Sequence, residues 1–487
     1  MSAVSTPAGP RLGPRYGAAR PGGAGLMLGI AGLALAGALM GIGLVLGEVD
    51  AFYITLSVIG CAAVLYDFRI GAVLLIVMVP IEASSLIPHS LLGITGLNPV
   101  NVLLGATLVS YLLHGRYQRA GALIPKPLLW LYIVPFLLAG LHGMTHTGEI
   151  APAILDLESV HFSDAAGYFR DIVAKPLFLV LAAMLVGAAI ARSSKPERYL
   201  VAIGVSIWAM CMVSLHAVAI SGVSMAELSA PGSRAFFSGL GMHANDLGRM
   251  YAVAYALLLF AWAESKSRPF RLACVATMAL VVAALVFTFS RGAFVGFLLV
   301  NALFLLWRSN AKTAAIAILV GTLLLVVLPG AVFDRMSMGF DTGDANEVSA
   351  GRIDGIWLPL LPEVLTSPPW GNGLGSTIWS KAMRQGLMIE VAHPHSAYME
   401  AILDAGLIGL GLVLAYFVHV WKGFRSLGSN PFLTPEMRGF YQGATAALLS
   451  FFVTGFAGSS FQPHTEYAFL WLAIGMMYGQ LARRPAG

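Results

Sequence analysis

Charged residues are scarce in this chain. Aspartate, glutamate, lysine and arginine together make up 11% of its 487 residues, whereas hydrophobic residues make up 58%. A soluble globular domain carries about 25% charged residues, so the composition excludes an ordinary soluble enzyme and indicates a protein built for lipid. Cysteine is also rare. Cys61, Cys211 and Cys274 all fall within apolar stretches, which favours buried thiols and provides no disulfide framework.

Basic residues are present, but they form no stripe. The formal net charge is +5, and the lysines and arginines stand between hydrophobic blocks, which argues against a nucleic-acid partner. On one side of the predicted membrane every loop carries lysine or arginine, whereas the loops on the other side are acidic or mixed. The positive-inside rule therefore places both termini in the cytoplasm.

Long apolar runs recur along the whole chain. A membrane-spanning helix needs about 20 mostly apolar residues, and fourteen runs come close to that length. The sequence therefore predicts an all-α polytopic membrane protein with about fourteen transmembrane helices. The expected spans are 26–47, 51–67, 70–88, 99–114, 127–143, 172–191, 199–221, 247–264, 270–289, 292–308, 313–330, 396–421, 439–458 and 465–482.

The spacing of these runs also predicts how the chain is organised. One connecting segment on the outer side is much longer than the others, and loops of that length are usually functional. Its apolar residues at 353–365 keep helical spacing, which predicts a short interfacial helix. We expect a disordered cytoplasmic tail at 1–25, amino-terminal spans within 26–230, central spans with an SRG turn at 231–330, a large periplasmic loop with short interfacial helices at 331–395, and carboxy-terminal spans at 396–487.

Several cationic side chains lie on the predicted outer face, although the positive-inside rule favours basic residues on the cytoplasmic side. Arginine is suited to bidentate binding of phosphate, and histidine exchanges a proton near neutral pH. Each residue alone also has an ordinary explanation, because a single arginine can end a helix by pairing with a carboxylate and a single histidine is more often structural than catalytic. The cations on this face are Arg234, Arg249, Arg291, Arg352, His243, His393, His395 and His464.

Two carboxylates and three tryptophans near the long loop are further candidates. Glu400 and Asp404 stand four residues apart at the start of the span 396–421, where ionisable groups are costly. They either face a solvated cavity or stabilise the first turns of that helix. Trp357, Trp370 and Trp379 are suited to stacking on sugar rings and equally to anchoring the chain at the membrane interface.

The order of short motifs in this region resembles the O-antigen ligase/polymerase superfamily. That group includes O-antigen ligases, O-antigen and exopolysaccharide polymerases, and bacterial protein O-oligosaccharyltransferases. The resemblance covers about residues 230–420, and one departure is Ser396, which stands where the family usually has Asn after its active-site histidine. The motifs are SRG at 290–292, GR…IW at 351–357, PWGNGLG at 369–375 and HPHSAYMEAILDAGLIGLG at 393–411.

The resemblance implies a glycosyltransferase of the bacterial inner membrane with its active site facing the periplasm. The donor would be a glycan on undecaprenyl diphosphate, and the acceptor a hydroxyl group on another glycan, on lipid A-core or on a protein. The family requires no nucleotide sugar, metal ion or other cofactor, and the sequence has no nucleotide-binding motif or tight aspartate cluster. Membrane lipids and a chain-length regulator are further candidate partners.

The resemblance also assigns roles to individual residues. His395 stands at the position of the family's active-site histidine, so we expect it to be the catalytic base. Arg291 and Arg352 are expected to stabilise the leaving diphosphate, because an enzyme without a metal needs cationic side chains for that charge. The expected substrate-binding residues are Arg234, Arg249, His393, Ser396, Glu400, Trp370 and Trp379.

Several functions remain open at this point. We favour polymerisation of glycan repeat units because the aromatic residues of the long loop suit a groove that retains a growing chain. Ligation of the glycan to lipid A-core and O-glycosylation of protein are the alternatives within the family. A membrane transporter is the alternative outside it. Transporters place ionisable residues near the membrane midplane within repeated halves, whereas here they gather at one boundary beside one asymmetric loop.

Overall fold

A computed structural model describes most of the chain in two compact units, residues 1–59 and 60–487. In the first unit only Gly37, Gly41 and the residues from Val49 onward are described, and they are helical. The second unit contains all the other elements discussed below. The described residues are 37, 41, 49–84, 86–115, 122–150, 152–155, 160, 162–224, 227, 237, 240–308, 330–340, 343–458 and 460–483.

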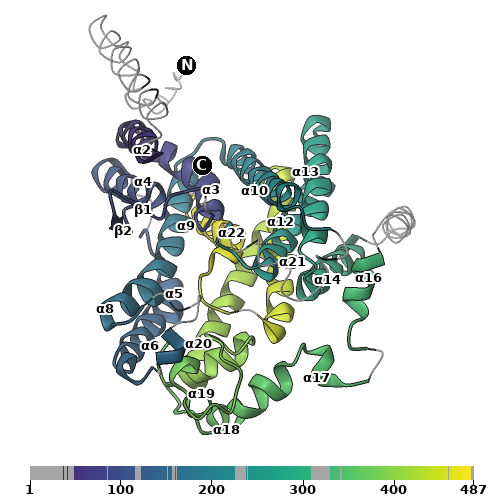
Figure 1. Ribbon diagram of the computed structural model, residues 1–487. Helices are drawn as coiled ribbons and strands as arrows, with labels where there is room; N and C mark the ends of the chain where they lie inside the picture. The colour runs from purple at the N-terminus through teal and green to yellow at the C-terminus, as the bar shows by residue number, and fades with distance from the viewer. Residues whose placement is uncertain are drawn as a thin grey trace, which may run out of the picture. The chain divides into compact units, whose positions relative to one another are not determined.

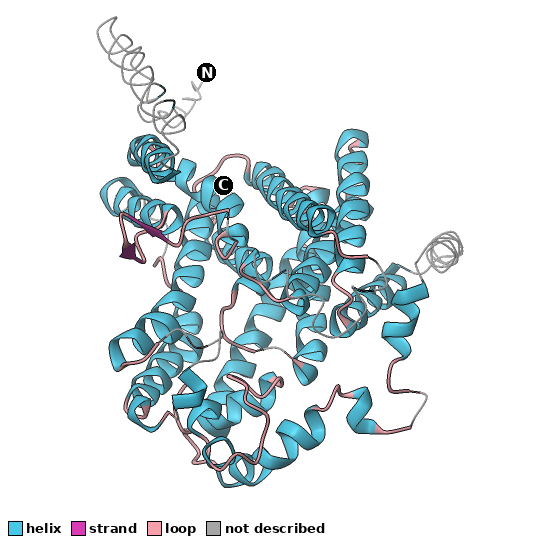
Figure 2. Cartoon of the chain, in the orientation of Figure 1, coloured by secondary structure: helices cyan, strands magenta, loops and turns pink. Residues whose placement is uncertain are grey.

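Regular structure in the described residues is almost entirely helical (Figure 2). The two short strands, β1 (Ser90–Leu91) and β2 (Ile94–Thr95), form an antiparallel hairpin. The helices are α2 (Val49–Tyr66), α3 (Phe68–Met78), α4 (Pro99–Ser110), α5 (Lys126–Leu128), α6 (Val134–Met144), α7 (Pro152–Leu155), α8 (Ala165–Tyr168), α9 (Lys175–Ala191), α10 (Tyr199–Ser221), α12 (Ala244–Glu264), α13 (Arg268–Phe287), α14 (Arg291–Arg308), α16 (Gly330–Ser337), α17 (Ala345–Val348), α18 (Leu358–Thr366), α19 (Lys381–Arg384), α20 (Ala397–Gly428), α21 (Pro435–Thr454) and α22 (Ala468–Ala482).

The all-α membrane architecture predicted from the sequence is confirmed in its general form. Of the fourteen predicted spans, those at 26–47 and 313–330 lie almost entirely outside the described residues, and the others coincide with helices. Seven helical segments in the described part are long and apolar enough to cross a membrane. The number fourteen therefore stays a prediction. The seven segments are Lys126–Met144, Ala165–Ala191, Pro196–Ser221, Arg268–Phe287, Arg291–Arg308, Ala397–Gly428 and Pro435–Ala457.

Small residues allow the central helices to pack closely. A Cβ atom on Gly439 or Gly443 of α21 would lie 2.3 or 2.4 Å from a backbone oxygen of α12. A Cβ atom on Gly475 or Gly479 of α22 would lie 1.9 or 2.1 Å from a backbone oxygen of α9. Both pairs have the spacing of small residues four apart that lets membrane helices approach backbone to backbone. These contacts hold α12 and α22, which are buried along most of their length, in the middle of the bundle (Figure 1).

The long loop shares a small apolar core with α6 and the segment before α9. Ile356, Leu360 and Trp379 from the loop pack with Phe136 of α6 and Val173 of the π-helical turn Phe169–Ala174 before α9. The predicted interfacial helix is present as α18, preceded by the π-helical turn Ile353–Trp357. Its helical spacing buries Ile356 and Leu360 against the core, and it leaves three leucines exposed on the opposite side. The exposed leucines are Leu358, Leu361 and Leu365.

Helix α20 is broken near its first third, and the loop docks at the break. Gly406 has φ 68° and ψ −175°, which no helical residue adopts. The turn PWGNGLG lies against this point, where the backbone N–H of Asn372 donates to Leu403 O at 2.7 Å and that of Gly373 donates to Asp404 O at 2.9 Å. A Cβ atom at Gly406 would lie 2.1 Å from Pro369 O, so the break and the turn require glycine for both conformation and space.

Candidate active site

The two histidines of the HPH motif lie directly before α20 in a constrained turn. The indole N–H of Trp357 donates to Pro394 O at 2.9 Å and ties this turn to the long loop. His395 has φ 52°, an uncommon conformation for a residue with a side chain. Its backbone N–H donates to Nδ1 of His393 at 3.3 Å, and the ring centroids are 4.2 Å apart. Non-glycine residues held in this conformation cluster at functional sites.

Both imidazoles are held in the neutral form. Desolvation and then the positive charges of nearby residues, including Arg249 and Arg352, lower the pKa of His395 to about 2. Desolvation and the same two arginines lower the pKa of His393 to about 4, against an opposing effect of Glu466. His393 keeps an exposed face and His395 a partly exposed one. At neutral pH both rings are therefore uncharged and open to a ligand from the same side as the arginines.

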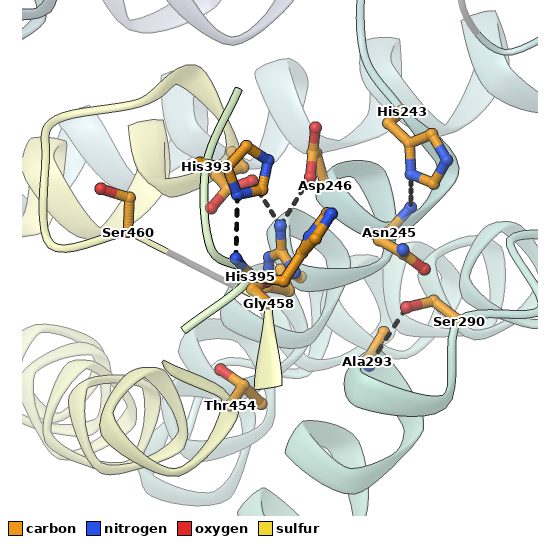
Figure 3. A network of polar contacts seen from close by, with 12 residues as sticks. His243, Asn245, Asp246, Ser290, Ala293, His393, His395, Thr454, Gly458 and Ser460 are labelled. Atoms are coloured by element: carbon orange, nitrogen blue, oxygen red, sulfur yellow. Dashed lines mark hydrogen bonds and ion pairs between the residues drawn. The ribbon is translucent and has the colours of Figure 1, made fainter. Parts of the chain in front are cut away.

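Arg249 is already neutralised by carboxylates. Its guanidinium donates to Asp246 Oδ1 at 2.6 Å and to Glu466 Oε2 at 2.8 Å, and it also contacts Gly458 O. The side chain is 9% exposed. Figure 3 shows this network with His393 and His395 beside it. Arg249 thus joins α12 to the segment between α21 and α22, so its contribution to an anion site is mainly structural.

Arg352 approaches the same turn without a carboxylate partner in the described part of the chain. Its Nη1 donates to Ala457 O at 3.0 Å. A Cβ atom on Gly458 (φ 111°) would lie 3.5 Å from Nη1 of Arg352 and 3.6 Å from Nη1 of Arg249. Desolvation, followed by the charges of three other arginines, lowers the pKa of Arg352 to about 10, so it stays charged at neutral pH. The three arginines are Arg249, Arg291 and Arg335.

Arg291 and Arg335 meet at Met338, at the end of α16. The guanidinium of Arg291, at the start of α14, donates to Met338 O at 3.0 Å. Nη1 of Arg335 lies 3.1 Å from the thioether sulfur of Met338, a weak acceptor. Arg335 is 9% exposed, and its Nε has no hydrogen-bond partner. Desolvation and the charge of Arg291 lower the pKa of Arg335.

The sequence analysis missed Arg335. The signal was available, because Arg335 is another arginine on the predicted outer side and thus runs against the same charge bias that singled out Arg291 and Arg352. Its position after an apolar run made it look like the end of a helix. Arg352 lies close enough to Arg291 and Arg335 to feel their charges, and its own charge acts on His393 and His395.

The aromatic residues expected to stack on sugars behave differently from one another. Trp370 is 63% exposed and is available as a platform. Trp379 is 4% exposed and packs at 5.6 Å from the ring of His146 and 6.2 Å from that of Tyr168. The expectation that Trp379 lines an open groove is therefore wrong, because its indole ring fills the core of the long loop.

The polar residues at the start of α20 hold the loop and line a hollow. Asp404 Oδ1 accepts from the N–H of Ser376 at 3.0 Å and from its hydroxyl at 2.8 Å. The side-chain amide of Gln462 donates to Glu400 Oε1 at 3.2 Å and to Asp404 Oδ2 at 3.3 Å. Glu400 thus contacts Gln462, and no described hydrogen bond joins it to His395. A hollow of about 470 Å³, open at its mouth, is lined by these carboxylates and by aromatic rings.

Ser396 and Arg234 are the two remaining residues that the sequence predicted to bind substrate. Ser396 is the N-cap residue of α20 and is buried, but its hydroxyl makes no capping hydrogen bond. Arg234 lies outside the described residues. Among the described residues no group of three His, Cys, Asp or Glu side chains is arranged to hold a metal ion. The site therefore combines cations that lack carboxylates with neutral imidazoles, an arrangement suited to a multiply charged anion and a proton transfer beside it.

Residues 276–414 match the sequence model of a family described as O-antigen ligase. The matched segment contains Arg291, Arg335, Arg352, His393 and His395, so it includes every cation of the site that lacks a carboxylate. Arg249, which is neutralised, lies before it. No curated protein is significantly similar to the chain.

Proposed function

We propose that this protein, a member of the O-antigen ligase/polymerase superfamily, polymerises glycan repeat units carried on undecaprenyl diphosphate. The observation that carries the proposal is the position of Arg352 within the matched segment, where it lies near Arg291 and Arg335 and also near the two neutral histidines. Family membership supports an enzyme that acts on a lipid-linked glycan donor and an acceptor. The polymerase activity, the inner-membrane location and the periplasmic orientation belong to the proposal.

The proposed reaction exchanges one bond at the anomeric carbon of the donor sugar. The acceptor hydroxyl loses its proton to His395 and its oxygen forms a bond to the anomeric carbon. The bond between that carbon and the diphosphate oxygen breaks, and its electron pair stays on the diphosphate. Arg291 and Arg352 hold the diphosphate and stabilise the charge that it gains, which is usually the largest contribution to catalysis.

The charges of the site explain how a histidine with a low pKa can act as the base. In the absence of an anion, desolvation first, and then His393 and the neighbouring arginines, keep the pKa of His395 near 2, at which it is a weak base. A bound diphosphate offsets part of this positive charge and raises the pKa of His395 toward neutrality. Base catalysis is most effective when the pKa is close to the working pH, so binding of the donor activates the base.

The choice of polymerisation over ligation rests on the surface of the long loop. Trp370 and the leucines on the outer side of α18 are exposed, and such a surface suits contact with a growing chain and its lipid carrier. A ligase that transfers the glycan to lipid A-core is the second candidate, supported by the description of the matched family. A protein O-oligosaccharyltransferase is a further alternative within the family. Membrane lipids and a chain-length regulator are proposed partners.

Deletion of the gene separates these activities. For a polymerase, the mutant cell retains single repeat units on its surface glycan and loses long chains, and a plasmid copy restores them. Full-length chains that accumulate on the lipid carrier without being attached would instead identify a ligase. Unchanged glycan with altered movement of a solute across the membrane would support the transporter alternative.

A further inference from the structure

Within the described residues, three arginines near the proposed diphosphate site form no ion pair, whereas several arginines elsewhere do. Arg170 pairs with Asp171 at 2.7 Å, and Arg384 pairs with Glu149 at 3.0 Å. Within the described residues, Arg291 and Arg352 instead donate to backbone oxygens. Arg335 contacts a sulfur atom. Other described arginines without an ion pair, such as Arg271 and Arg425, are exposed and lie over a tryptophan ring, so Arg335 differs from them by its burial.

Arg335 is the least satisfied of the three. It is 9% exposed, its Nε has no partner, and its one contact through Nη1 is to a thioether. Arg291 and Arg352 are only partly buried and each donates to a carbonyl oxygen. A buried charge without a partner destabilises a fold. Such a group persists when a function requires it.

The number of unpaired cations can be compared with the charge of the ligand. A lipid-linked glycan diphosphate is a diester with two negative charges. When the bond to the sugar breaks, the leaving lipid diphosphate carries three, and the proton of the acceptor hydroxyl goes to His395. Three unpaired arginines therefore exceed the charge of the donor by one and equal the charge of the leaving group.

We propose that Arg335 binds the charge that develops on the leaving diphosphate, whereas Arg291 and Arg352 neutralise the two charges that the donor already carries. This inference rests on the proposed function and adds a catalytic residue to it. Interactions that strengthen only as the bond breaks raise the rate without tightening binding of the donor. Arg335 is also the most buried of the three, and a buried charge acts more strongly on a developing charge because less solvent screens it.

The first test measures binding without turnover. The probes are inorganic pyrophosphate, with at least three negative charges, and P1,P2-dimethyl diphosphate, with two, each titrated into the purified full-length protein in detergent. We expect Arg335→Met to weaken pyrophosphate binding at least tenfold and to change dimethyl diphosphate binding less than threefold. Arg352→Met is expected to weaken both, and Arg384→Met, which removes a carboxylate-paired arginine, neither. Equal weakening of both probes by Arg335→Met, or of neither, would overturn the inference.

The second test measures turnover with a lipid-linked repeat unit. Arg335→Met should lower kcat about 100- to 1000-fold, the usual effect of removing one preorganised donor, with KM for the donor within threefold of wild type. Arg335→Lys should recover part of kcat because it keeps the charge but not the planar fork. The thermal midpoint of Arg335→Met should equal or exceed that of wild type, since a buried unpaired charge is removed. A wild-type kcat in Arg335→Met would refute the role of Arg335, whereas absence of transfer by the wild-type protein would refute the proposed function itself.

Discussion

The two ends of α14 carry one arginine each, and the two differ in what surrounds them. Arg308 at the carboxyl end forms an ion pair with Glu264, which also accepts from Arg438 at 3.2 Å. Arg291 at the amino end has a backbone oxygen as its hydrogen-bond acceptor among the described residues, and it lies near Arg335 and Arg352. The helix has 18 residues, so the two environments are about 27 Å apart at 1.5 Å per residue.

This difference teaches how to distinguish a structural arginine from a functional one. At the carboxyl end, one carboxylate and two guanidinium groups satisfy one another and join α12, α14 and α21. At the amino end no described carboxylate neutralises Arg291, and under our proposal this charge binds the diphosphate. Substitutions at either end of α14 and at the neighbouring histidines test whether the unpaired arginines are needed for activity.

Removal of the proposed base is expected to have the largest effect. His395→Ala should abolish detectable glycan transfer while the protein level and the pool of lipid-linked donor stay normal, because the arginines that bind the donor remain. His393→Ala should reduce transfer less, since its ring mainly accepts the N–H of His395. Glycan chain length in complemented deletion cells measures both. If His393 were essential and His395 dispensable, the assignment of the base would move to His393.

Adding a carboxylate at the amino end should make it resemble the carboxyl end. Met338 contacts both Arg291 and Arg335, so Met338→Glu places a carboxylate between them. We expect the thermal midpoint to rise and the transfer rate to fall about 100- to 1000-fold, because the paired arginines no longer stabilise the leaving group. Met338→Gln is the neutral control of similar size and should keep most of the activity. Full activity in Met338→Glu would show that these arginines do not need to be unpaired.

Replacing arginine by lysine at each end of α14 should distinguish a role in ligand binding at Arg291 from a role in stability at Arg308. Arg291→Lys keeps the charge but loses the planar fork, so we expect activity to fall about tenfold to 100-fold with little change in stability. Arg308→Lys should lower the thermal midpoint by a few degrees and leave the rate per folded molecule unchanged. Both rates are measured in the presence of EDTA. Inhibition by EDTA that a divalent ion reverses would point to metal chemistry instead of arginine chemistry.

The smallest expected effect concerns pH. The pKa of His395 is about 2 in the folded protein and about 6.5 in an unfolded chain, so the unfolded state takes up the proton first. Its contribution to stability is fully present above pH 6.5 and is lost as the pH falls below that value. We expect the thermal midpoint to drop between pH 7 and pH 5, and to drop less in His395→Gln. Pyrophosphate should reduce the difference between the two proteins, and an identical pH response with and without His395 would contradict the environment described for this ring.

The sequence predicted most of the described helices, but it did not predict which arginines of the candidate site are neutralised. Apolar runs predicted the helices because membrane spans require length and hydropathy, both of which are local properties. The motif order predicted Arg291, Arg352 and His395 on one face, and in the structure Arg352 lies near each of the other two. Pairing is a tertiary property, so nothing in the local sequence showed that Asp246 and Glu466 neutralise Arg249.

The burial of Trp379 and the position of Arg335 also depend on tertiary packing, which the local sequence does not show. A tryptophan in a polar loop is equally compatible with an open platform and a buried core, and only packing against Tyr168 shows that Trp379 is buried. Arg335 was passed over because no motif surrounds it. It is a candidate only because α16 folds back toward the start of α14, which places its guanidinium near that of Arg291.

The docking of the PWGNGLG turn on the break in α20 has a consequence for protein engineering. The loop packs on α6 and the segment before α9 through a shared apolar core, and it is attached to α20 through backbone hydrogen bonds and the side chain of Asp404. The loop is therefore a segment that could be exchanged between related proteins while α20 is kept. A chimera that carries the loop of a relative must keep Gly371, Gly373, Gly406 and Asp404, because these four residues form the contact between the loop and α20. The exposed side of α18 and the surroundings of Trp370 can then be varied to change which glycan the catalyst accepts.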